Sequence, residues 1–262
     1  MSRRRLIAGL ISAVVVLGVV IGVALTIAGS RHPTPAAAPQ DRPGPVLLVP
    51  GYGGEGSGLL PLAARLRSQG RLAEVITLPG IGTGDLREQA KTLGAAAKAA
   101  LARTGAASVD VVGYSAGGVV ARLWTKSYGG AALARRIITV GSPHHGTDLA
   151  GLASALDSAS CPAACQQLSP GSSLLGALNR GDETPAGPRW VSLWSTNDQV
   201  VTPPDSARLS GALNVVLQDV CPHVRVEHGE LPASPLVESI VLADLGAAAV
   251  TAPQAGECGR LR

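Results

Sequence analysis

The pentapeptide Gly113–Gly117 (GYSAG) lies between an apolar run and a stretch with helical spacing. The run Val109–Val112 predicts a buried strand, and residues 118–124 predict a helix. A G-x-S-x-G turn at such a junction is so sharp that the serine backbone is strained, and we expect a Cβ at either glycine to collide with the adjacent strand or helix. The helix N-terminus favours negative charge near Ser115. This context predicts a nucleophilic serine; the alternative is a glycine-rich turn with an incidental serine.

Apolar runs alternate with amphipathic stretches from Val46 onward, in a chain of 262 residues of which 46% are hydrophobic. The predicted strands are 46–49, 74–78, 109–112, 136–140, 190–194 and 213–217, and the predicted helices are 59–69, 85–104, 118–124 and 234–248. Strands that are apolar throughout and separated by helices indicate a parallel sheet covered on both faces. The sequence therefore predicts an α/β fold with a mostly parallel sheet of about six strands.

The N-terminus has the pattern of a targeting segment. Arg3–Arg5 precede an uncharged apolar stretch, Leu6–Gly29. This stretch exceeds the h-region of a cleaved signal, so residues 1–30 predict a membrane anchor with a cytoplasmic N-terminus. Cleavage at Thr26–Ala28, which loosely resembles a small-residue cleavage site, with secretion, is the alternative. Residues 31–44 are rich in Pro and Ala and predict an extended linker, and residues 45–262 form the predicted catalytic domain.

The four cysteines agree with a location outside the cytoplasm, where disulfides persist. They allow three connectivities, and the simplest pairs Cys161 with Cys165 and Cys221 with Cys258. A zinc site is the competing interpretation, but the C-x-x-x-C spacing lacks a matching second pair of ligands. We therefore expect two disulfides and no metal.

Charge and motifs exclude two classes of ligand. The net charge is +4, but three of the arginines lie at the extreme N-terminus, so the remainder is nearly balanced. Basic runs interleaved with aromatic residues are absent, so no nucleic-acid partner is expected. The glycine-rich segment Gly51–Gly54 lacks the lysine of a phosphate-binding loop. We expect a monomer that takes a small-molecule or lipid substrate and needs no cofactor.

A serine nucleophile needs a general base and an acid that orients the base. In a fold of this kind the chain order is serine, then Asp or Glu, then His. His228 lies in a loop between the last strand and the last helix and is the predicted base, with His223 as its rival. Asp198 directly follows the strand 190–194 and is the predicted acid. Asp205 and Asp219 are the alternatives. The loop histidine and the turn aspartate could also have no catalytic role.

An oxyanion hole needs two backbone N–H groups that point at the substrate carbonyl oxygen. The amide of Ala116, directly after the serine, is the first predicted donor. The second is the amide of Tyr52, in the glycine-rich turn after the first strand, where glycines let the backbone approach closely. The alternative interpretation of that turn is a flexible loop.

Six stretches together resemble the α/β-hydrolase superfamily, and specifically the small secreted bacterial lipases and esterases of the class 2 lipase type. They span nearly all of residues 45–250 in the family's order. The stretches are PVLLVPGYGG (45–54), LPGIGTGDLREQ (78–89), DVVGYSAGGVVAR (110–122), VGSPHHGT (140–147), TNDQVVTP (196–203) and EHGEL (227–231).

The resemblance implies an α/β-hydrolase fold and assigns the site residues. Ser115 is the implied nucleophile, Asp198 the acid and His228 the base, with Tyr52 and Ala116 as oxyanion donors. One departure is that Pro50-Gly51 replaces the His-Gly that usually precedes the oxyanion residue in this family, so hydrogen bonding in that loop must differ. The pair His144-His145 could line the rim of the site, and ordinary loop packing is an equal alternative.

The leading hypothesis is an exported carboxylic-ester hydrolase that acts through an acyl-enzyme. Leu59, Leu60 and Leu149 are possible lining residues of an acyl pocket. Acyl transfer to a wall glycan or a lipid alcohol is a second hypothesis on the same scaffold. A third is a non-catalytic binding module that has kept the fold, because fold alone does not prove activity.

Overall fold

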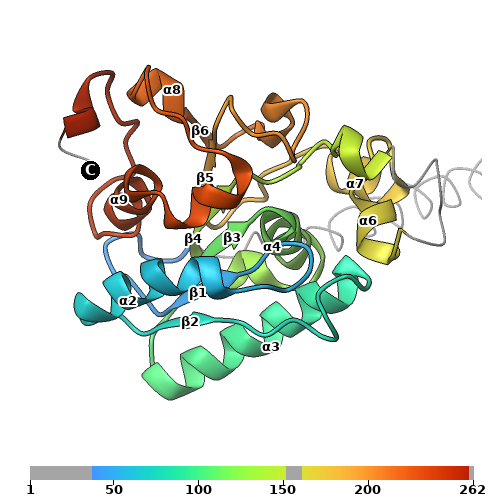
Figure 1. Ribbon diagram of the computed structural model, residues 1–262. Helices are drawn as coiled ribbons and strands as arrows, with labels where there is room; N and C mark the ends of the chain where they lie inside the picture. The colour runs from blue at the N-terminus through green and yellow to red at the C-terminus, as the bar shows by residue number, and fades with distance from the viewer. Residues whose placement is uncertain (1–36, 152–160, 260–262) are drawn as a thin grey trace, which may run out of the picture. The chain divides into compact units, whose positions relative to one another are not determined.

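The computed structural model describes residues 37–151 and 161–259, and a six-stranded sheet lies at its centre (Figure 1). The strands are β1 (Val46–Val49), β2 (Ala73–Val75), β3 (Val109–Tyr114), β4 (Ala134–Val140), β5 (Arg189–Trp194) and β6 (Leu213–Val216). Their order is β2-β1-β3-β4-β5-β6, and every neighbouring pair runs parallel. The predicted α/β fold with a parallel sheet is confirmed.

Helices cover both faces of the sheet (Figure 1). The α-helices that the structure describes from end to end are α2 (Leu60–Ser68), α3 (Leu86–Thr104), α4 (Ala116–Ser127), α6 (Ala163–Gln167), α7 (Ser173–Leu178), α8 (Leu217–Val220) and α9 (Pro235–Asp244), and residues 148–151 are also helical. Short 3-10 helices are η1 (Ser57–Leu59), η2 (Gly130–Ala132), η3 (Pro204–Ala207), η4 (His228–Ala233) and η5 (Glu257–Gly259).

The alternation of side chains along each strand divides the core into two parts. In β1, Leu47 and Val49 belong to the cluster that includes the apolar faces of α3 and α4. Val46 and Leu48 belong to the opposite cluster, with α2 and α9. Successive side chains of a strand point to opposite faces, so a strand buried on both faces must be apolar throughout. This is why the apolar runs of the sequence predict the strands well.

Local signals set the ends of α3. The Asp85 side chain caps its N-terminus by accepting a hydrogen bond from the Arg87 amide at 2.8 Å. Gly105 ends the helix in the left-handed conformation, at φ 66°, which glycine adopts without a Cβ penalty. The helix predicted over 85–104 is therefore confirmed to within one residue.

The last helix is shorter than predicted, because α9 ends at Asp244 rather than at Ala248. Two buried arginine side chains bind the backbone carbonyl groups that follow the end of α9. Arg135 donates to the oxygens of Leu245 and Gly246, at 2.7 and 2.9 Å, and Arg136 donates to Ala248 at 2.6 Å. These contacts satisfy the backbone acceptors without a further helical turn.

The carboxyl ends of the strands lie at one edge of the sheet, and the predicted site residues follow them. Ser115 comes directly after β3, Asp198 follows β5, and His228 begins η4 after β6 and α8. Ligands of parallel sheets bind at this edge. The topology therefore brings together residues that are more than a hundred positions apart in the chain.

Both disulfides of the simplest pairing are present, Cys161–Cys165 and Cys221–Cys258. These bonds use all four cysteines, so none of them is available as a zinc thiolate. The predicted anchor or signal over 1–30 lies outside the described residues. Within 37–151 and 161–259, no helix is long and apolar enough to cross a membrane. Gln40, in the predicted linker, accepts a hydrogen bond from Arg135 at 2.7 Å through its backbone oxygen.

Candidate active site

Ser115 has a strained backbone. Its φ of 53° and ψ of −126° make it the one non-glycine residue with positive φ in the described parts of the chain. Its amide donates to the Val140 oxygen at 2.8 Å, which holds the turn against β4. A non-glycine residue in this region of φ and ψ costs about 1–3 kcal/mol and persists only where the surrounding structure fixes it. The turn presents the serine hydroxyl at the start of α4.

The two glycines of the pentapeptide have no room for a side chain. A Cβ at Gly113 would lie 2.6 Å from the backbone of Gly117 and Gly118, in the first turn of α4. A Cβ at Gly117 would lie 2.6 Å from the oxygen of Pro50, at the end of β1. The collisions predicted from the sequence are therefore confirmed.

Three polar side chains form a continuous hydrogen-bonded chain behind the turn. His228 Nε2 lies 3.0 Å from Ser115 Oγ, and His228 Nδ1 lies 2.7 Å from Asp198 Oδ2. All three residues are largely buried: Ser115 is 9% exposed, His228 is 6% exposed and Asp198 is 4% exposed. Because little water reaches these groups, the contacts among them are stronger than they would be at the surface.

Backbone amides hold the Asp198 carboxylate. Its Oδ1 accepts from the amides of Val200 and Val201 at 2.9 and 2.8 Å, which leaves Oδ2 for the histidine. The turn after β5 therefore fixes both the position of the carboxylate and the direction in which Oδ2 points.

His228 is held by a capping box and by a tyrosine. Glu227 and Glu230 exchange side-chain-to-backbone hydrogen bonds around the start of η4. The Tyr114 hydroxyl donates to the His228 backbone oxygen at 3.0 Å. Burial raises the pKa of Tyr114 to about 12, and the Asp198 charge adds to this, so the phenol stays protonated as a donor. The two glutamates of the EHGEL stretch are therefore the residues that form this capping box.

The alternative acids and base lie away from this cluster. His223, Asp205 and Asp219 are all exposed. Of the candidates that the sequence offers, His228 is the histidine that the structure brings within hydrogen-bonding distance of Ser115, and Asp198 is the aspartate that contacts that histidine.

The two predicted oxyanion donors flank the serine. Ala116 is the first residue of α4, and Tyr52 lies in the turn after β1. Within the described residues, neither amide donates a hydrogen bond to another protein group. A Cβ at Gly51 would lie 2.9 Å from Ser115 Cβ, so this glycine lets the β1 turn approach the serine closely.

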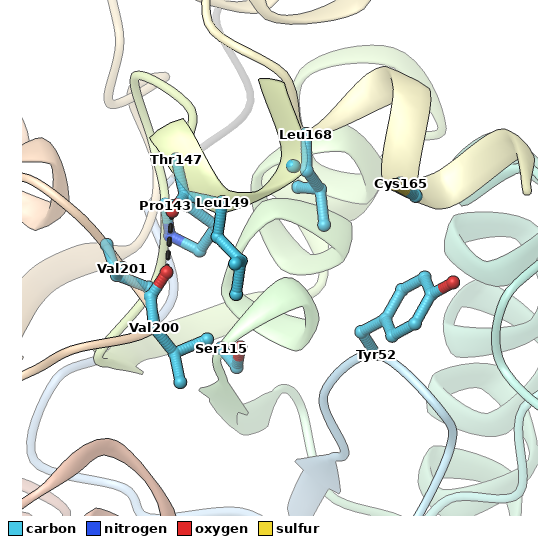
Figure 2. Close-up of a pocket in the computed structure, with 10 residues that line it drawn as sticks. Tyr52, Ser115, Pro143, Thr147, Leu149, Cys165, Leu168, Val200 and Val201 are labelled. Atoms are coloured by element: carbon cyan, nitrogen blue, oxygen red, sulfur yellow. Dashed lines mark hydrogen bonds between the residues drawn. The ribbon is translucent and has the colours of Figure 1, made fainter. Parts of the chain in front are cut away.

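An apolar pocket of about 280 Å³ adjoins Ser115 (Figure 2). Its lining residues are Tyr52, Ser115, Pro143, Thr147, Leu149, Ala150, Cys165, Leu168, Val200 and Val201. Figure 2 shows Val200 and Val201 on one side of Ser115 and Tyr52 on the other. Leu149 lines the pocket as expected, but Leu59 is buried in the core with α2 and Leu60 is not among the lining residues.

A sequence model of the family described as Lipase (class 2) matches residues 96–231, more than half of the chain. The chain belongs to the class 2 lipase family. A search of the curated proteins found no match to the sequence.

The solved structures that resemble this lipase-family chain share its fold. The mature form of Bacillus licheniformis lipase BlEst2 matches with a TM-score of 0.64 and 20% identity, over 82% of this chain and 96% of that one. Aspergillus fumigatus lipase B matches with a TM-score of 0.63 and 20% identity, over 87% and 62%. The Listeria innocua lin2722 product matches with a TM-score of 0.58 and 15% identity, over 81% and 98%. The fold is that of the α/β-hydrolases.

Among the described residues that line the pocket beside Ser115, neither His144 nor His145 is present. His144 is fully buried, with Nε2 3.0 Å from the Thr139 hydroxyl, and burial together with the Arg122 charge lowers its pKa well below the usual value. His145 lies 3.0 Å from the Glu183 carboxylate at the surface. Ordinary loop packing therefore describes both residues.

Two further residues support the candidate site and carry no clear signal in the sequence. Gly141, at φ 54°, packs against the histidine and its acid, and a Cβ there would lie 3.4 Å from His228 Nδ1 and 3.2 Å from Asp198 Oδ2. The same Cβ would lie 2.5 Å from Leu231. Tyr114 is the second, through its hydrogen bond to His228. Tyr114 lies inside the pentapeptide, but nothing in the sequence indicates which way its hydroxyl points.

Proposed function

We propose that this protein is an exported serine hydrolase of carboxylic esters, which acts through an acyl-enzyme on Ser115. The observation that carries the proposal is the unbroken chain of contacts from Ser115 Oγ through His228 to Asp198. Membership of the class 2 lipase family indicates that the substrate is a lipid ester. Acid, base and nucleophile in this geometry are the requirements for acyl transfer to a serine.

In the first half-reaction, His228 Nε2 takes the proton of Ser115 Oγ while Oγ forms a bond to the ester carbonyl carbon. The bond to the alcohol oxygen then breaks, and the alcohol leaves with the proton from His228. Asp198 Oδ2 accepts the Nδ1–H hydrogen bond throughout and stabilises the imidazolium. In the second half-reaction, water attacks the acyl carbon, and the same proton transfers release the acid and restore Ser115.

The amides of Tyr52 and Ala116 serve as the oxyanion hole in this mechanism. The carbonyl oxygen gains negative charge in each tetrahedral intermediate, and the two N–H groups beside the serine, which have no other partner among the described residues, can donate hydrogen bonds to it. One donor of this kind contributes about 10²–10³-fold to kcat. The N-terminal end of α4 adds a favourable dipole at the same place.

The proposed location is outside the cytoplasm. Two disulfides support it, because such bonds persist in oxidising compartments. The uncharged apolar stretch 6–29, preceded by three arginines, supports attachment to the membrane with the catalytic domain on the outer side. Fractionation of cells that produce the full chain tests this, with recovery in the membrane fraction expected and a soluble cytoplasmic protein as the contradicting result.

Hydrolysis is tested with p-nitrophenyl esters and with a triacylglycerol, by titration of the acid released. We expect the wild type to release acid and Ser115→Ala to lose all but the background rate. Ser68→Ala changes an exposed serine at the end of α2 and is the matched control with unchanged activity. Equal rates for wild type and Ser115→Ala would contradict the proposal. Added alcohols separate the second hypothesis, since ester products in place of free acid would identify an acyltransferase.

A further inference from the structure

The pocket beside Ser115 offers a ligand almost no hydrogen-bonding groups. Among the described residues, those that line it carry no charge. The hydroxyl of Thr147 donates to the Val200 oxygen at 2.6 Å and accepts from the Thr202 amide at 3.1 Å, so it is already satisfied. The Tyr52 hydroxyl lies at the end of the ring away from Ser115 (Figure 2). Such a surface binds hydrocarbon and rejects polar or charged acyl groups.

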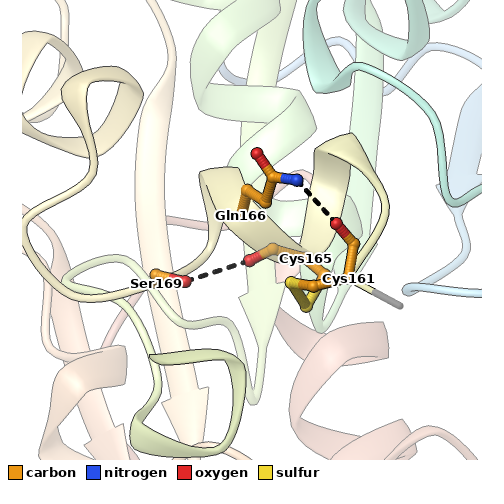
Figure 3. Close-up of a disulfide and its surroundings, with 4 residues drawn as sticks. All are labelled: Cys161, Cys165, Gln166 and Ser169. Atoms are coloured by element: carbon orange, nitrogen blue, oxygen red, sulfur yellow. Dashed lines mark hydrogen bonds between the residues drawn. A yellow bond between two sulfur atoms is a disulfide. The ribbon is translucent and has the colours of Figure 1, made fainter. Parts of the chain in front are cut away.

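One wall of this pocket comes from a short segment, 161–168, that carries a disulfide. Cys165 and Leu168 both line the pocket, and Leu168 is 5% exposed. In Figure 2 the Leu168 side chain points into the same space as Leu149. The Cys161–Cys165 bond joins the two ends of the first turn of the segment (Figure 3).

The segment is too short to keep its shape without such links. Helix α6 has five residues, and isolated helices of this length do not form in water. Besides the disulfide, the Gln167 side chain accepts from the Leu86 amide and donates to Asp85, both at 2.8 Å, which ties α6 to the start of α3. The Leu168 oxygen accepts from the Thr147 amide at 3.0 Å. The disulfide and these hydrogen bonds together fix where the wall lies relative to Ser115.

We propose that segment 161–168, fastened by the Cys161–Cys165 disulfide, sets the length of the hydrocarbon acyl chain that the site accepts. This inference rests on the proposed ester hydrolysis and adds to it the residues that select among esters of uncharged hydrocarbon acyl chains. Each methylene that enters the pocket raises kcat/KM about fourfold, and a methylene that remains in water adds nothing. The profile of kcat/KM against chain length therefore rises and then levels where the chain meets the wall.

The experiment measures kcat and KM for p-nitrophenyl esters from acetate to palmitate, below the concentrations at which they form micelles. Leu168→Ala removes a side chain from the wall, and we expect the plateau to move to longer chains. Leu168→Phe fills the same space, and we expect the plateau to move to shorter chains. Cys161→Ala/Cys165→Ala releases the wall. We expect kcat/KM of this variant to depend less on chain length than that of the wild type, with the change carried mainly by KM.

The matched control is Cys221→Ala/Cys258→Ala, which removes the disulfide that does not line the pocket. We expect this variant to keep the position of the plateau even if its kcat falls. Circular dichroism of every variant establishes that it is folded, and the opposite shifts of the two Leu168 variants do not depend on the cysteine variant. Identical profiles for the wild type and both folded Leu168 variants would overturn the inference. Absence of hydrolysis by the wild type would instead contradict the proposed function.

Discussion

Two parts of the site meet at Ser115 and are built in contrasting ways. The polar cluster with His228 and Asp198 is held by hydrogen bonds at nearly every polar atom. The adjoining pocket is apolar and is formed by loops, by the helical residues 148–151 and by the short helix α6. The contrast indicates that the two parts have separate roles, one in the reaction and one in substrate selection. In the proposed reaction, the cluster performs the same chemistry on any ester, and the pocket selects among esters by their acyl chains.

Each part has its own disulfide. Cys221–Cys258 closes a loop of 37 positions and lies seven residues before the predicted base, His228. Cys161–Cys165 spans four positions and lies in the pocket wall. Restriction of the unfolded chain gives the longer loop about 4 kcal/mol of stability and the shorter one about 2 kcal/mol. We therefore expect loss of Cys221–Cys258 to lower the catalytic rate and the stability of the fold. Loss of Cys161–Cys165 is expected to change which acyl chain lengths the site accepts.

Apart from loss of the serine or of the histidine base, the largest effect expected in the cluster is that of Asp198→Asn. The amide leaves the shape of the turn but no longer holds His228 in the tautomer that accepts a proton from Ser115. We expect kcat to fall by about 10⁴-fold for every ester in the series, with the chain-length plateau unmoved. Steady-state kinetics over the same series measure both quantities.

Asp205→Asn is the control for that variant, because Asp205 lies in the next turn of the chain and is exposed. We expect its kinetics to match those of the wild type. If Asp198→Asn kept full activity, or if it moved the plateau, the division between chemistry and selection would be wrong.

A smaller effect is expected from reduction of Cys221–Cys258. In the Cys161→Ala/Cys165→Ala background this is the remaining disulfide, so a titration with reductant reports on it alone. We expect activity to fall several-fold at reductant concentrations at which the far-ultraviolet circular dichroism is unchanged, because the segment before His228 loses its link to the C-terminal region. Activity and circular dichroism that decline together would show that the bond serves folding only.

The smallest effect on activity is expected far from both parts, at Asp244. Burial raises its pKa to about 7, and its Oδ2 has no hydrogen-bond partner among the described residues. The unfolded chain releases this proton near pH 4, and the folded chain keeps it until about pH 7. The free energy of unfolding should therefore fall by roughly 2–4 kcal/mol as the pH rises from 4 to 7, and this contribution should stay lost above pH 7.

Asp244→Asn should remove this fall in the free energy of unfolding with rising pH. Asp219→Asn, which changes an exposed aspartate, should keep it. Urea unfolding between pH 4 and pH 8 measures the slope of each variant against that of the wild type. The kcat/KM of Asp244→Asn at a fixed pH should equal the wild-type value. A slope unchanged by Asp244→Asn would mean that the carboxyl is ionised in the folded protein.

The sequence predicts the sheet and the long helices because their signals are local. Strand β1 is apolar at every position because both faces of the sheet are covered, and α3 carries its own caps at Asp85 and Gly105. Helices α6, α7 and α8 have four to six residues, too few for a periodic pattern. The end of α9 depends on Arg135 and Arg136, whose contacts come from a distant strand.

The distinction between local signals and contacts from distant parts of the chain also applies to the site. Ser115, Asp198 and His228 are predictable because each follows a strand and chain order constrains their roles. The pocket wall at Leu168 is not predictable, because its position depends on how α6 docks against α3. Gly141 supports the histidine only through packing, and a glycine at the end of a strand does not by itself indicate which side chain will pack against it.

The central claim is that Ser115 is the nucleophile, and the most direct measurement is covalent labelling with a fluorophosphonate followed by peptide mapping. We predict one phosphonyl group per protein on Ser115 Oγ, no label in Ser115→Ala, and slow labelling in His228→Ala, which lacks the base. Labelling of another residue in the wild type, or equal labelling of Ser115→Ala, would contradict the account.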